Sequence, residues 1–228
     1  CTFCGLNALG MAYRSKSPAR VLSGIHELAG RYNVYQFASV DNILDHRYIR
    51  EVFGPLAAQH MDYAFFWAVK ANLTREQLQA MGQSGVRRLQ PGIESLSTHV
   101  LRLMRKGATA IQNVCFLKWA LYYGMSVAWN ALLGFPGEQP EDYDRQLAIM
   151  RLIPHLEPPG SCTRIFLERF SPNYAQSAEL GIFNVRAERA YASIYPRELD
   201  VDRIAYFFDY DAPGALPDAT HEPMREYL

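Results

Sequence analysis

Short apolar segments alternate with helix-forming segments along most of this chain, and the alternation limits the folds that it can adopt. The apolar segments predict strands over residues 34–40, 63–69, 86–90, 126–133 and 163–170. Each of these strands except the last is followed by a predicted helix. Strand–helix repeats at this spacing are typical of an α/β fold, in which right-handed crossovers build a parallel sheet that is doubly wound or curled into a barrel.

The helices have recognisable start signals. Ser17 followed by Pro18 predicts an N-cap and a first-turn proline for the first helix. Thr74 and Gln77 predict a capping box for a later one. Further helices are predicted over residues 47–59, 97–123 with a break near Gly107, and 141–152. These helices would cover the sheet.

Composition bounds the class of protein. The chain of 228 residues can form one sizeable domain with an appendage. Lysine plus arginine and aspartate plus glutamate each number 23, so the charge balance predicts no binding to nucleic acid or to an anionic membrane. The apolar stretch 119–135 contains glycine and polar residues, which favours a helix end and a buried strand over a membrane span.

The strand and helix pattern weakens after about residue 175. Only one short helix is predicted beyond it, over residues 201–208. We therefore expect a core over residues 1–175 and a mostly irregular or helical extension over residues 176–228.

Two of the four cysteines, Cys1 and Cys4, form a C-x-x-C motif, and the other two are scattered. This is a poor disulfide framework and favours a reducing compartment such as the cytoplasm. The motif by itself fits half of a zinc site, a thioredoxin-type redox pair or part of an iron–sulfur cluster. Cys115 and Cys162 are predicted to be buried structural thiols. None of the six histidines has the spacing of metal ligands, so none is predicted to have a role.

Polar residues follow several predicted strands at the point where each strand ends. The candidates on four successive strand ends are Asp41, Asn42, Lys70, Glu94, Ser95 and Gly134. In a parallel sheet these ends lie along one edge, where ligands bind. The sequence therefore predicts a site at that edge.

Four motifs occur in order on this pattern: Phe3-Cys4, G-I-E-S over residues 92–95, L-R-L-M-R-K-G over 101–107 and L-G-F-P-G-E over 133–138. Together they resemble the radical S-adenosylmethionine enzymes, over about residues 1–175. The likeness is strongest to the cobalamin-binding branch, especially the radical C-methyltransferases that mature ribosomally made peptides. It implies a partial TIM-type (β/α)6 barrel that lacks its first strand in this chain. It also leads us to expect a piece of a longer protein, because the chain begins inside the C-x-x-x-C-x-x-C motif of these enzymes.

The resemblance implies a set of cofactor-binding residues. Cys1 and Cys4 would be the second and third thiolate ligands of a 4Fe–4S cluster, with Phe3 as the aromatic residue before the last cysteine. The open iron of such a cluster binds S-adenosylmethionine. Asp41 and Asn42 would hold the methionine amino group.

The remaining candidates follow from the same resemblance. Lys70, at the next strand end, is a further cofactor-binding candidate. Glu94 and Ser95 would contact the ribose hydroxyls and the methionine portion. Lys106 would pair with the methionine carboxylate, because a partly desolvated carboxylate needs a positive partner. The residues that would line the adenine are Leu132, Leu133 and Gly134. Gly134 has no side chain, so it lets the backbone approach the ligand closely.

Each assignment has a structural alternative. Asp41 and Asn42 fit an Asx turn that leaves a strand. Ser95 fits a helix cap, and Lys106 fits a solvated helix end that interacts with the helix dipole. The segment 134–137 forms a tight turn whatever its function.

The resemblance implies an enzyme that reductively cleaves S-adenosylmethionine at the cluster and modifies a peptide substrate, by C-methylation in the maturation of ribosomal peptides or bacteriocins. Cobalamin would be bound by a domain outside this chain, and a reducing electron donor would be needed. Residues 1–228 alone are expected to be inactive, and no catalytic side chain is predicted.

Several alternatives to this function remain open. Within the same superfamily, a methylthiotransferase or a peptide cyclase would use the same radical without cobalamin. Outside it, Cys1 would be the lipid-bearing residue of a lipoprotein-type binding domain. A barrel hydrolase would need a partner for Glu94, and the sequence suggests none.

Overall fold

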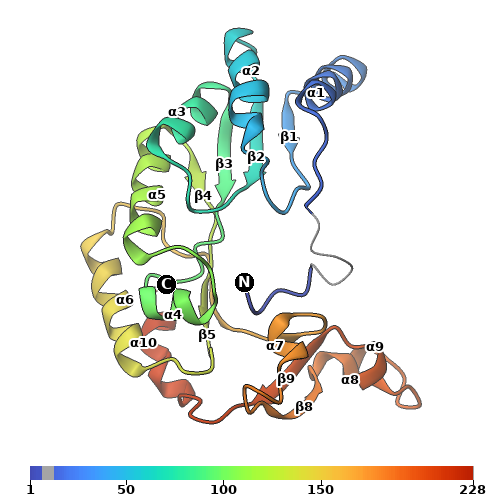
Figure 1. Ribbon diagram of the computed structural model, residues 1–228, viewed down its shortest axis with the longest axis vertical. Helices are drawn as coiled ribbons and strands as arrows, with labels where there is room; N and C mark the ends of the chain where they lie inside the picture. The colour runs from blue at the N-terminus through green and yellow to red at the C-terminus, as the bar shows by residue number, and fades with distance from the viewer. Residues whose placement is uncertain (7–12, 228) are drawn as a thin grey trace.

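The computed structural model describes residues 1–6 and 13–227. A four-stranded parallel sheet in the order β1-β2-β3-β4 forms one half of the molecule (Figure 1). Its strands are β1 (Gln36–Ala38), β2 (Ala64–Ala68), β3 (Val86–Gln90) and β4 (Ser126–Val127). Every pairing in this sheet is parallel, which confirms the predicted α/β fold.

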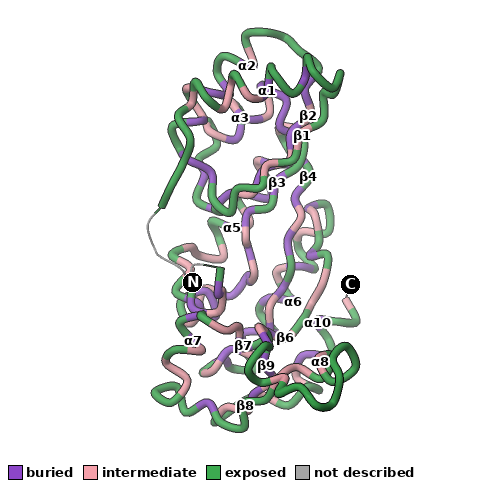
Figure 2. Tube along the Cα trace, turned by 90° about the vertical axis from the view of Figure 1, so that its right-hand side faces the viewer, coloured by how far each residue is buried: buried purple, intermediate pink, exposed green. Residues whose placement is uncertain are grey.

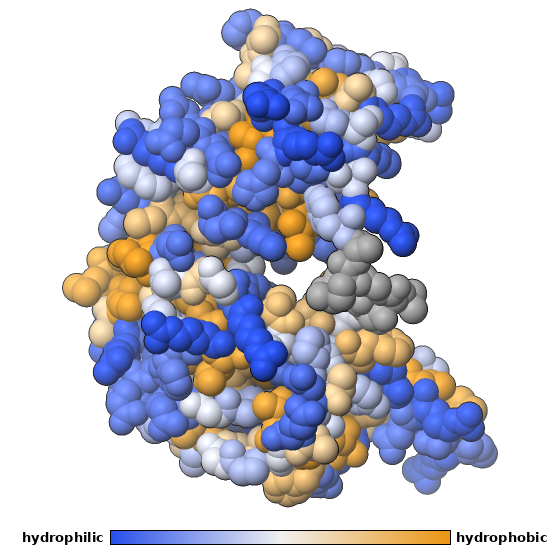
Figure 3. All heavy atoms as spheres, in the orientation of Figure 1, coloured by the Kyte–Doolittle hydropathy of each residue, from blue (hydrophilic) through white to orange (hydrophobic). Residues whose placement is uncertain are grey.

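Helices cover the outer, convex face of the sheet (Figure 1). They are α1 (Pro18–Tyr32), the π-helical turn Ile49–Phe53 that continues into α2 (Gly54–Ala58), α3 (Arg75–Gln83) and α5 (Ala110–Tyr122). Phe65, Trp67 and Leu89 are almost fully buried in the core beneath them. Arg88 and Gln90 are exposed. The molecule is hollowed on the side where the first residues lie, as Figure 3 shows.

The predicted helix starts are confirmed. The Ser17 hydroxyl accepts a hydrogen bond from the Arg20 amide, and Thr74 and Gln77 form the capping box of α3. Ser97 caps α4 (Thr98–Leu103), and the helical region breaks before α5 at Gly107, whose φ is 72°.

The strand predicted over residues 126–133 is in fact two. β4 stays with β3, whereas β5 (Ala131–Leu133) forms a two-stranded parallel sheet with β6 (Cys162–Arg164). One bridge, Glu94 with Ala131, links this pair to the end of β3. Gly92 and Glu94 have φ values of 58° and 61°, so the chain after β3 turns too sharply for a continuous ladder.

The last predicted strand, residues 163–170, also divides. After β6, the segment β7 (Leu167–Glu168) joins an antiparallel sheet in the order β7-β9-β8, with β8 (Phe183–Ala187) and β9 (Phe207–Asp211). This pairing crosses residue 175, where the core was predicted to end. In Figure 2 the buried segments run along the whole length of the molecule, from the parallel sheet to β7.

Residues 176–227 are mostly irregular or helical, as predicted, but they also contain strands that the sequence did not reveal. The helix predicted over 201–208 is wrong in its second half. α9 covers Val201–Ile204, and Phe207 begins β9. Phe208 and Tyr210 are buried while Phe207 and Asp209 are not, which is the two-residue period of a strand.

The other helices are α6 (Pro140–Leu152), α7 (Pro172–Ala175), α8 (Ala190–Ile194), the 3-10 turn Asp218–Thr220 and α10 (Glu222–Glu226). None of the helices in the described ranges has both the length and the apolar character that a membrane crossing requires. Cys115 corrects a prediction, because its side chain is exposed on α5 rather than buried. Helix α5 is apolar on its outer surface too, with Ile111 and Tyr122 both 67% exposed, so its apolar composition misled the burial prediction.

Candidate functional site

The first residues of the chain lie on the concave side, held between α4 and α7 (Figure 1). The Thr2 amide donates a hydrogen bond of 3.0 Å to the Met104 carbonyl, and the Asn173 amide donates one of 2.9 Å to the Thr2 carbonyl. We call residues 1–5 the cysteine loop. Cys1 is exposed and Cys4 is half-buried. The backbone of Thr2, between the two cysteines, is therefore held by α4 through its amide and by α7 through its carbonyl.

The cysteine loop also contacts the turn that follows β5. The ring of Phe3 packs edge-on against the ring of Phe135, with 5.7 Å between their centres. Phe3 and Leu132 both pack against a second apolar cluster, which includes Leu101, Met104 and Phe208. Two of the sequence motifs, more than 120 residues apart, thus meet in space.

Glu94 and Lys106 form an ion pair beside this loop, with 3.3 Å between Oε1 and Nζ. Their side chains are only 17% and 18% exposed. The Lys106 ammonium also lies 5.6 Å from the centre of the Phe3 ring. The sequence had offered no partner for Glu94, and the structure supplies one from the turn that follows α4. The result is a charged pair that faces the cysteine loop, and we call Glu94 and Lys106 together the Glu94 corner.

Gly92 makes room for this ion pair. A Cβ atom at Gly92 would lie 3.0 Å from Nζ of Lys106 and 3.2 Å from Oε1 of Glu94. The residue also has a positive φ of 58°, which glycine adopts readily. Glycine is therefore required here both by backbone conformation and by the space that the pair occupies.

Three other predicted residues follow the strands β1 and β2. Asp41, Asn42 and Lys70 are exposed after their strands.

Ser95 and Leu133 occupy different surroundings from the rest. Ser95 is fully buried, and its hydroxyl donates a 2.8 Å hydrogen bond to Oε1 of Gln146. The cap of α4 is Ser97, so the alternative that Ser95 caps this helix is wrong. Leu133 is fully buried in the main core, whereas Leu132 packs, like Phe3, against the second apolar cluster.

Gly134 begins the turn of the fourth motif, with a φ of 84°. A Cβ atom there would lie 2.6 Å from Cγ of Arg164. The Tyr210 hydroxyl donates a 3.1 Å hydrogen bond to the Gly134 carbonyl, and burial raises the pKa of Tyr210 to about 12. This phenol thus stays protonated and remains a donor to the turn.

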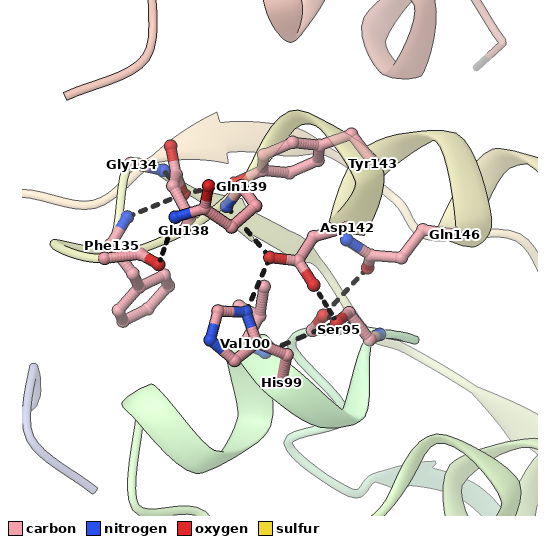
Figure 4. A network of polar contacts seen from close by, with 12 residues as sticks. Ser95, His99, Val100, Gly134, Phe135, Glu138, Gln139, Asp142, Tyr143 and Gln146 are labelled. Atoms are coloured by element: carbon pink, nitrogen blue, oxygen red, sulfur yellow. Dashed lines mark hydrogen bonds and ion pairs between the residues drawn. The ribbon is translucent and has the colours of Figure 1, made fainter. Parts of the chain in front are cut away.

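The carboxylate of Glu138 organises the same turn from inside (Figure 4). Its Oε2 accepts hydrogen bonds of 2.8 Å from the amides of Gly134 and Phe135 and a further short one from the Tyr143 hydroxyl. Its Oε1 lies 3.0 Å from Nε2 of His221, which is itself buried. Burial, and then the neighbouring Glu138 charge, raise the pKa of Tyr143. A buried charge with this many partners is fully satisfied.

A second buried network ties α6 to the loop after Glu94 (Figure 4). Asp142 accepts hydrogen bonds from the Ser97 hydroxyl at 2.7 Å and the Gln139 amide at 2.9 Å, and it lies 2.8 Å from Nδ1 of His99. Burial acts to raise the pKa of Asp142, but these hydrogen bonds outweigh it and the pKa is lowered. The two networks hold the Glu94 corner and the Gly134 turn against one helix.

His221 and His99 were missed at the sequence level. His221 reaches Glu138 across 83 positions and His99 reaches Asp142 across 43, so no local spacing could reveal either pair. Glu138 ends the fourth sequence motif, but only the structure shows what it binds.

The candidate metal ligands are the two thiols. Across residues 1–6 and 13–227, no three His, Cys, Asp or Glu side chains gather as a metal site. Two cavities of about 440 and 450 Å³ also lie in this part of the chain, and neither is lined by Cys1, Cys4, Glu94 or Lys106. Thiolates select soft metals and iron–sulfur clusters, so the donor set fits a cluster better than a hard cation.

The chain is similar to a known protein family and to a known protein. Residues 1–147 match the family described as the radical SAM superfamily. A protein of Pyrococcus horikoshii named "uncharacterized methyltransferase PH0819" is 24% identical over 157 residues, which are 67% of this chain and 34% of that protein.

Two solved structures share the fold. The radical S-adenosylmethionine methyltransferase TsrM from Kitasatospora setae, with cobalamin and a [4Fe-4S] cluster bound, superposes with a TM-score of 0.73 at 15% identity, covering 100% of this chain and 50% of TsrM. The cobalamin-dependent S-adenosylmethionine radical enzyme OxsB, with aqua-cobalamin bound, has a TM-score of 0.66 at 15% identity, covering 79% of this chain and 33% of OxsB. At these identities the likeness shows the fold. The chain spans between a third and a half of the length of these relatives.

Proposed function

Because the chain belongs to the radical SAM superfamily, we propose that it forms the core of a cobalamin-dependent methyltransferase that uses S-adenosylmethionine and a 4Fe–4S cluster. The observation that carries this proposal is the meeting of the cysteine loop with the Glu94–Lys106 pair. The methyltransferase activity is supported by the names of PH0819 and TsrM, and the use of cobalamin by the TsrM and OxsB structures.

The residues present fit an iron–sulfur cluster. Cys1 and Cys4 would supply thiolate ligands from a loop that backbone hydrogen bonds already fix. The chemistry that a bound cluster supplies is the one-electron cleavage of S-adenosylmethionine. Phe3, packed on Phe135, would shield one side of the loop from water.

The Glu94–Lys106 corner would hold S-adenosylmethionine. The Lys106 ammonium would bind the methionine carboxylate, and the Glu94 carboxylate would accept hydrogen bonds from the ribose hydroxyls. The Lys106 side chain is only 18% exposed, so a carboxylate gains more from its charge than from that of a surface lysine. Asp41, Asn42 and Lys70 remain candidates for the methionine end of the ligand.

The adenine would lie against Leu132 and the backbone of Gly134. The turn at Gly134 is fixed by Glu138, which makes it a preformed surface. Leu133 would support that surface from the core. Ser95 would act in the same indirect way, because its hydroxyl already bonds Gln146 behind the Glu94 corner.

For the substrate, we propose a peptide that is methylated at carbon, as in the maturation of ribosomally made peptides. This narrower assignment rests on the resemblance of the sequence to the radical C-methyltransferases that mature such peptides. A reducing electron donor is required, and a reducing compartment such as the cytoplasm suits a chain whose four cysteines are all free. A methylthiotransferase or a peptide cyclase is the competing outcome.

The test uses the full protein, reconstituted without oxygen with iron, sulfide and cobalamin. S-adenosylmethionine with a deuterated methyl group and a panel of linear peptides are the probes, with a reductant supplied. We expect mass spectrometry to find the labelled methyl group on a peptide carbon. If S-adenosylmethionine is cleaved but no cobalamin-dependent labelled product forms, the methyltransferase assignment is overturned. Membership of the family would stay intact.

A further inference from the structure

Gly5, which directly follows Cys4, is held by a side chain from the antiparallel sheet. Its amide donates a 2.7 Å hydrogen bond to Oε2 of Glu168, on β7. The Tyr206 hydroxyl donates to the same carboxylate oxygen at 3.3 Å. Tyr206 stands immediately before β9, so both groups come from the same small sheet.

The fit around Gly5 leaves no space for a larger residue. A Cβ atom there would lie 2.3 Å from the Arg169 carbonyl oxygen and 2.5 Å from the Tyr206 hydroxyl oxygen. Contacts this short cannot be accommodated without moving the backbone at Arg169, directly after β7. The end of the cysteine loop is therefore seated directly on the antiparallel sheet.

The sheet that carries these groups is internally braced. The Arg169 amide donates to the Tyr206 carbonyl at 2.7 Å. The Arg169 guanidinium donates to the carbonyls of Ala205 and Asp202 at 2.6 and 2.5 Å. Glu168 and Tyr206 thus have little freedom to follow the loop if it moves, and a rigid support is what a precisely placed ligand needs.

We propose that Glu168 and Tyr206 are positioning residues for the cluster, acting through the Gly5 amide. Glu168 fixes the loop directly after Cys4, and Tyr206 fixes the Glu168 carboxylate. This inference rests on the proposed function, because it takes Cys4 to be a cluster ligand. It assigns to the antiparallel sheet, which lies beyond the matched residues 1–147, a part in holding the cofactor.

Because Glu168 and Tyr206 act through the Gly5 amide, we expect them to affect how long the cluster is retained and not only whether it forms. Residues that orient metal ligands typically contribute about 10- to 100-fold in metal affinity. A carboxylate that accepts a backbone N–H is a strong, charge-assisted contact, and an amide side chain of the same shape replaces it with a weaker one. Glu168→Gln therefore weakens the contact without emptying the space.

The experiment compares Glu168→Gln and Tyr206→Phe with the unaltered full protein after anaerobic reconstitution. We expect Glu168→Gln to release iron to a chelator about 10-fold faster, with a smaller increase for Tyr206→Phe. Hydrogen exchange at the Gly5 amide, followed in the cluster-free protein, should quicken in the same order. The matched controls are Glu179→Gln and Tyr195→Phe, at exposed positions of the same region, which should change neither rate.

The outcomes separate this inference from the proposed function. If the unaltered protein retains no iron, the proposed function fails, and this inference fails with it. If it retains iron and Glu168→Gln and Tyr206→Phe lose it no faster than their controls, only the positioning role is overturned. Faster Gly5 exchange without faster iron loss also overturns it, because the contact would then serve the fold alone. Should Glu168→Gln fail to fold, Tyr206→Phe decides by the same two rates.

Discussion

Glu94 and Glu138 both follow strands of the site, but their surroundings differ sharply. Glu94 is partly exposed, has a strained backbone with φ of 61°, and has one charged partner, Lys106. Glu138 is buried, and its two oxygens are engaged by two backbone amides, a phenol and an imidazole. The first has capacity left for a ligand, whereas the second has none. The comparison distinguishes a residue placed to bind from one placed to hold the backbone.

The largest effect is expected at Glu138. Glu138→Ala leaves the amides of Gly134 and Phe135 and the side chains of Tyr143 and His221 buried without their acceptor. We expect the free energy of unfolding to fall by about 3–5 kcal/mol, as when one partner of a buried charged pair is removed. Urea denaturation measures it. The control is Glu141→Ala on the exposed first turn of α6, and similar losses in both variants would contradict a special role for Glu138.

At Lys106 the change should appear in binding rather than in stability. Lys106→Met keeps much of the side chain's volume but removes its charge, so a charged hydrogen bond worth about 1.5–3 kcal/mol is lost from the ligand. The dissociation constant for S-adenosylmethionine should rise at least about 10-fold, measured by calorimetry on the reconstituted protein. Arg105→Met, at the exposed neighbouring position, is the control. An unchanged affinity in Lys106→Met would show that Lys106, like Glu138, is not placed to bind the ligand.

A smaller effect is expected at Gly92 and Gly107, where substitutions separate the cost of a strained backbone from the cost of crowding the ion pair. Both have positive φ values, 58° and 72°, so alanine at either position should cost about 1–2 kcal/mol of stability. Only at Gly92 would the new Cβ meet Lys106 and Glu94, because the space at Gly107 is open among the described residues. Gly92→Ala should therefore also weaken S-adenosylmethionine binding, and Gly107→Ala should not. Equal affinities in the two variants would show that the ion pair needs no such space.

The smallest effect concerns acid stability at Asp142. Its pKa is lower in the folded protein than in the unfolded chain, so its contribution is present above about pH 4 and is lost as pH falls through the folded value. Asp142→Asn should be less stable than the unaltered protein at neutral pH. The difference should shrink as unfolding is measured at successively lower pH. A difference that stays constant with pH would show that proton binding at Asp142 is not responsible.

Local patterns predicted much of the parallel half of the molecule. The capping box of Thr74 and Gln77, the cap at Ser97 and the strand Val86–Gln90 depend on neighbours within a few residues, so the sequence shows them directly. The long strand predicted over 126–133 failed for the opposite reason. After the break, β5 pairs with β6 and bridges through Ala131 to Glu94, so its partners come from other parts of the chain.

By itself, the sequence determined the alternating fold, the strand ends that face the site and the four motifs that mark the family, because periodicity and capping act between near neighbours. Tertiary structure alone decided which groups meet: Lys106 with Glu94, His221 with Glu138, and Glu168 with Gly5. Those contacts join residues between 12 and 163 positions apart. Burial makes each contact matter, since a charge removed from water must find its partner wherever the chain brings one.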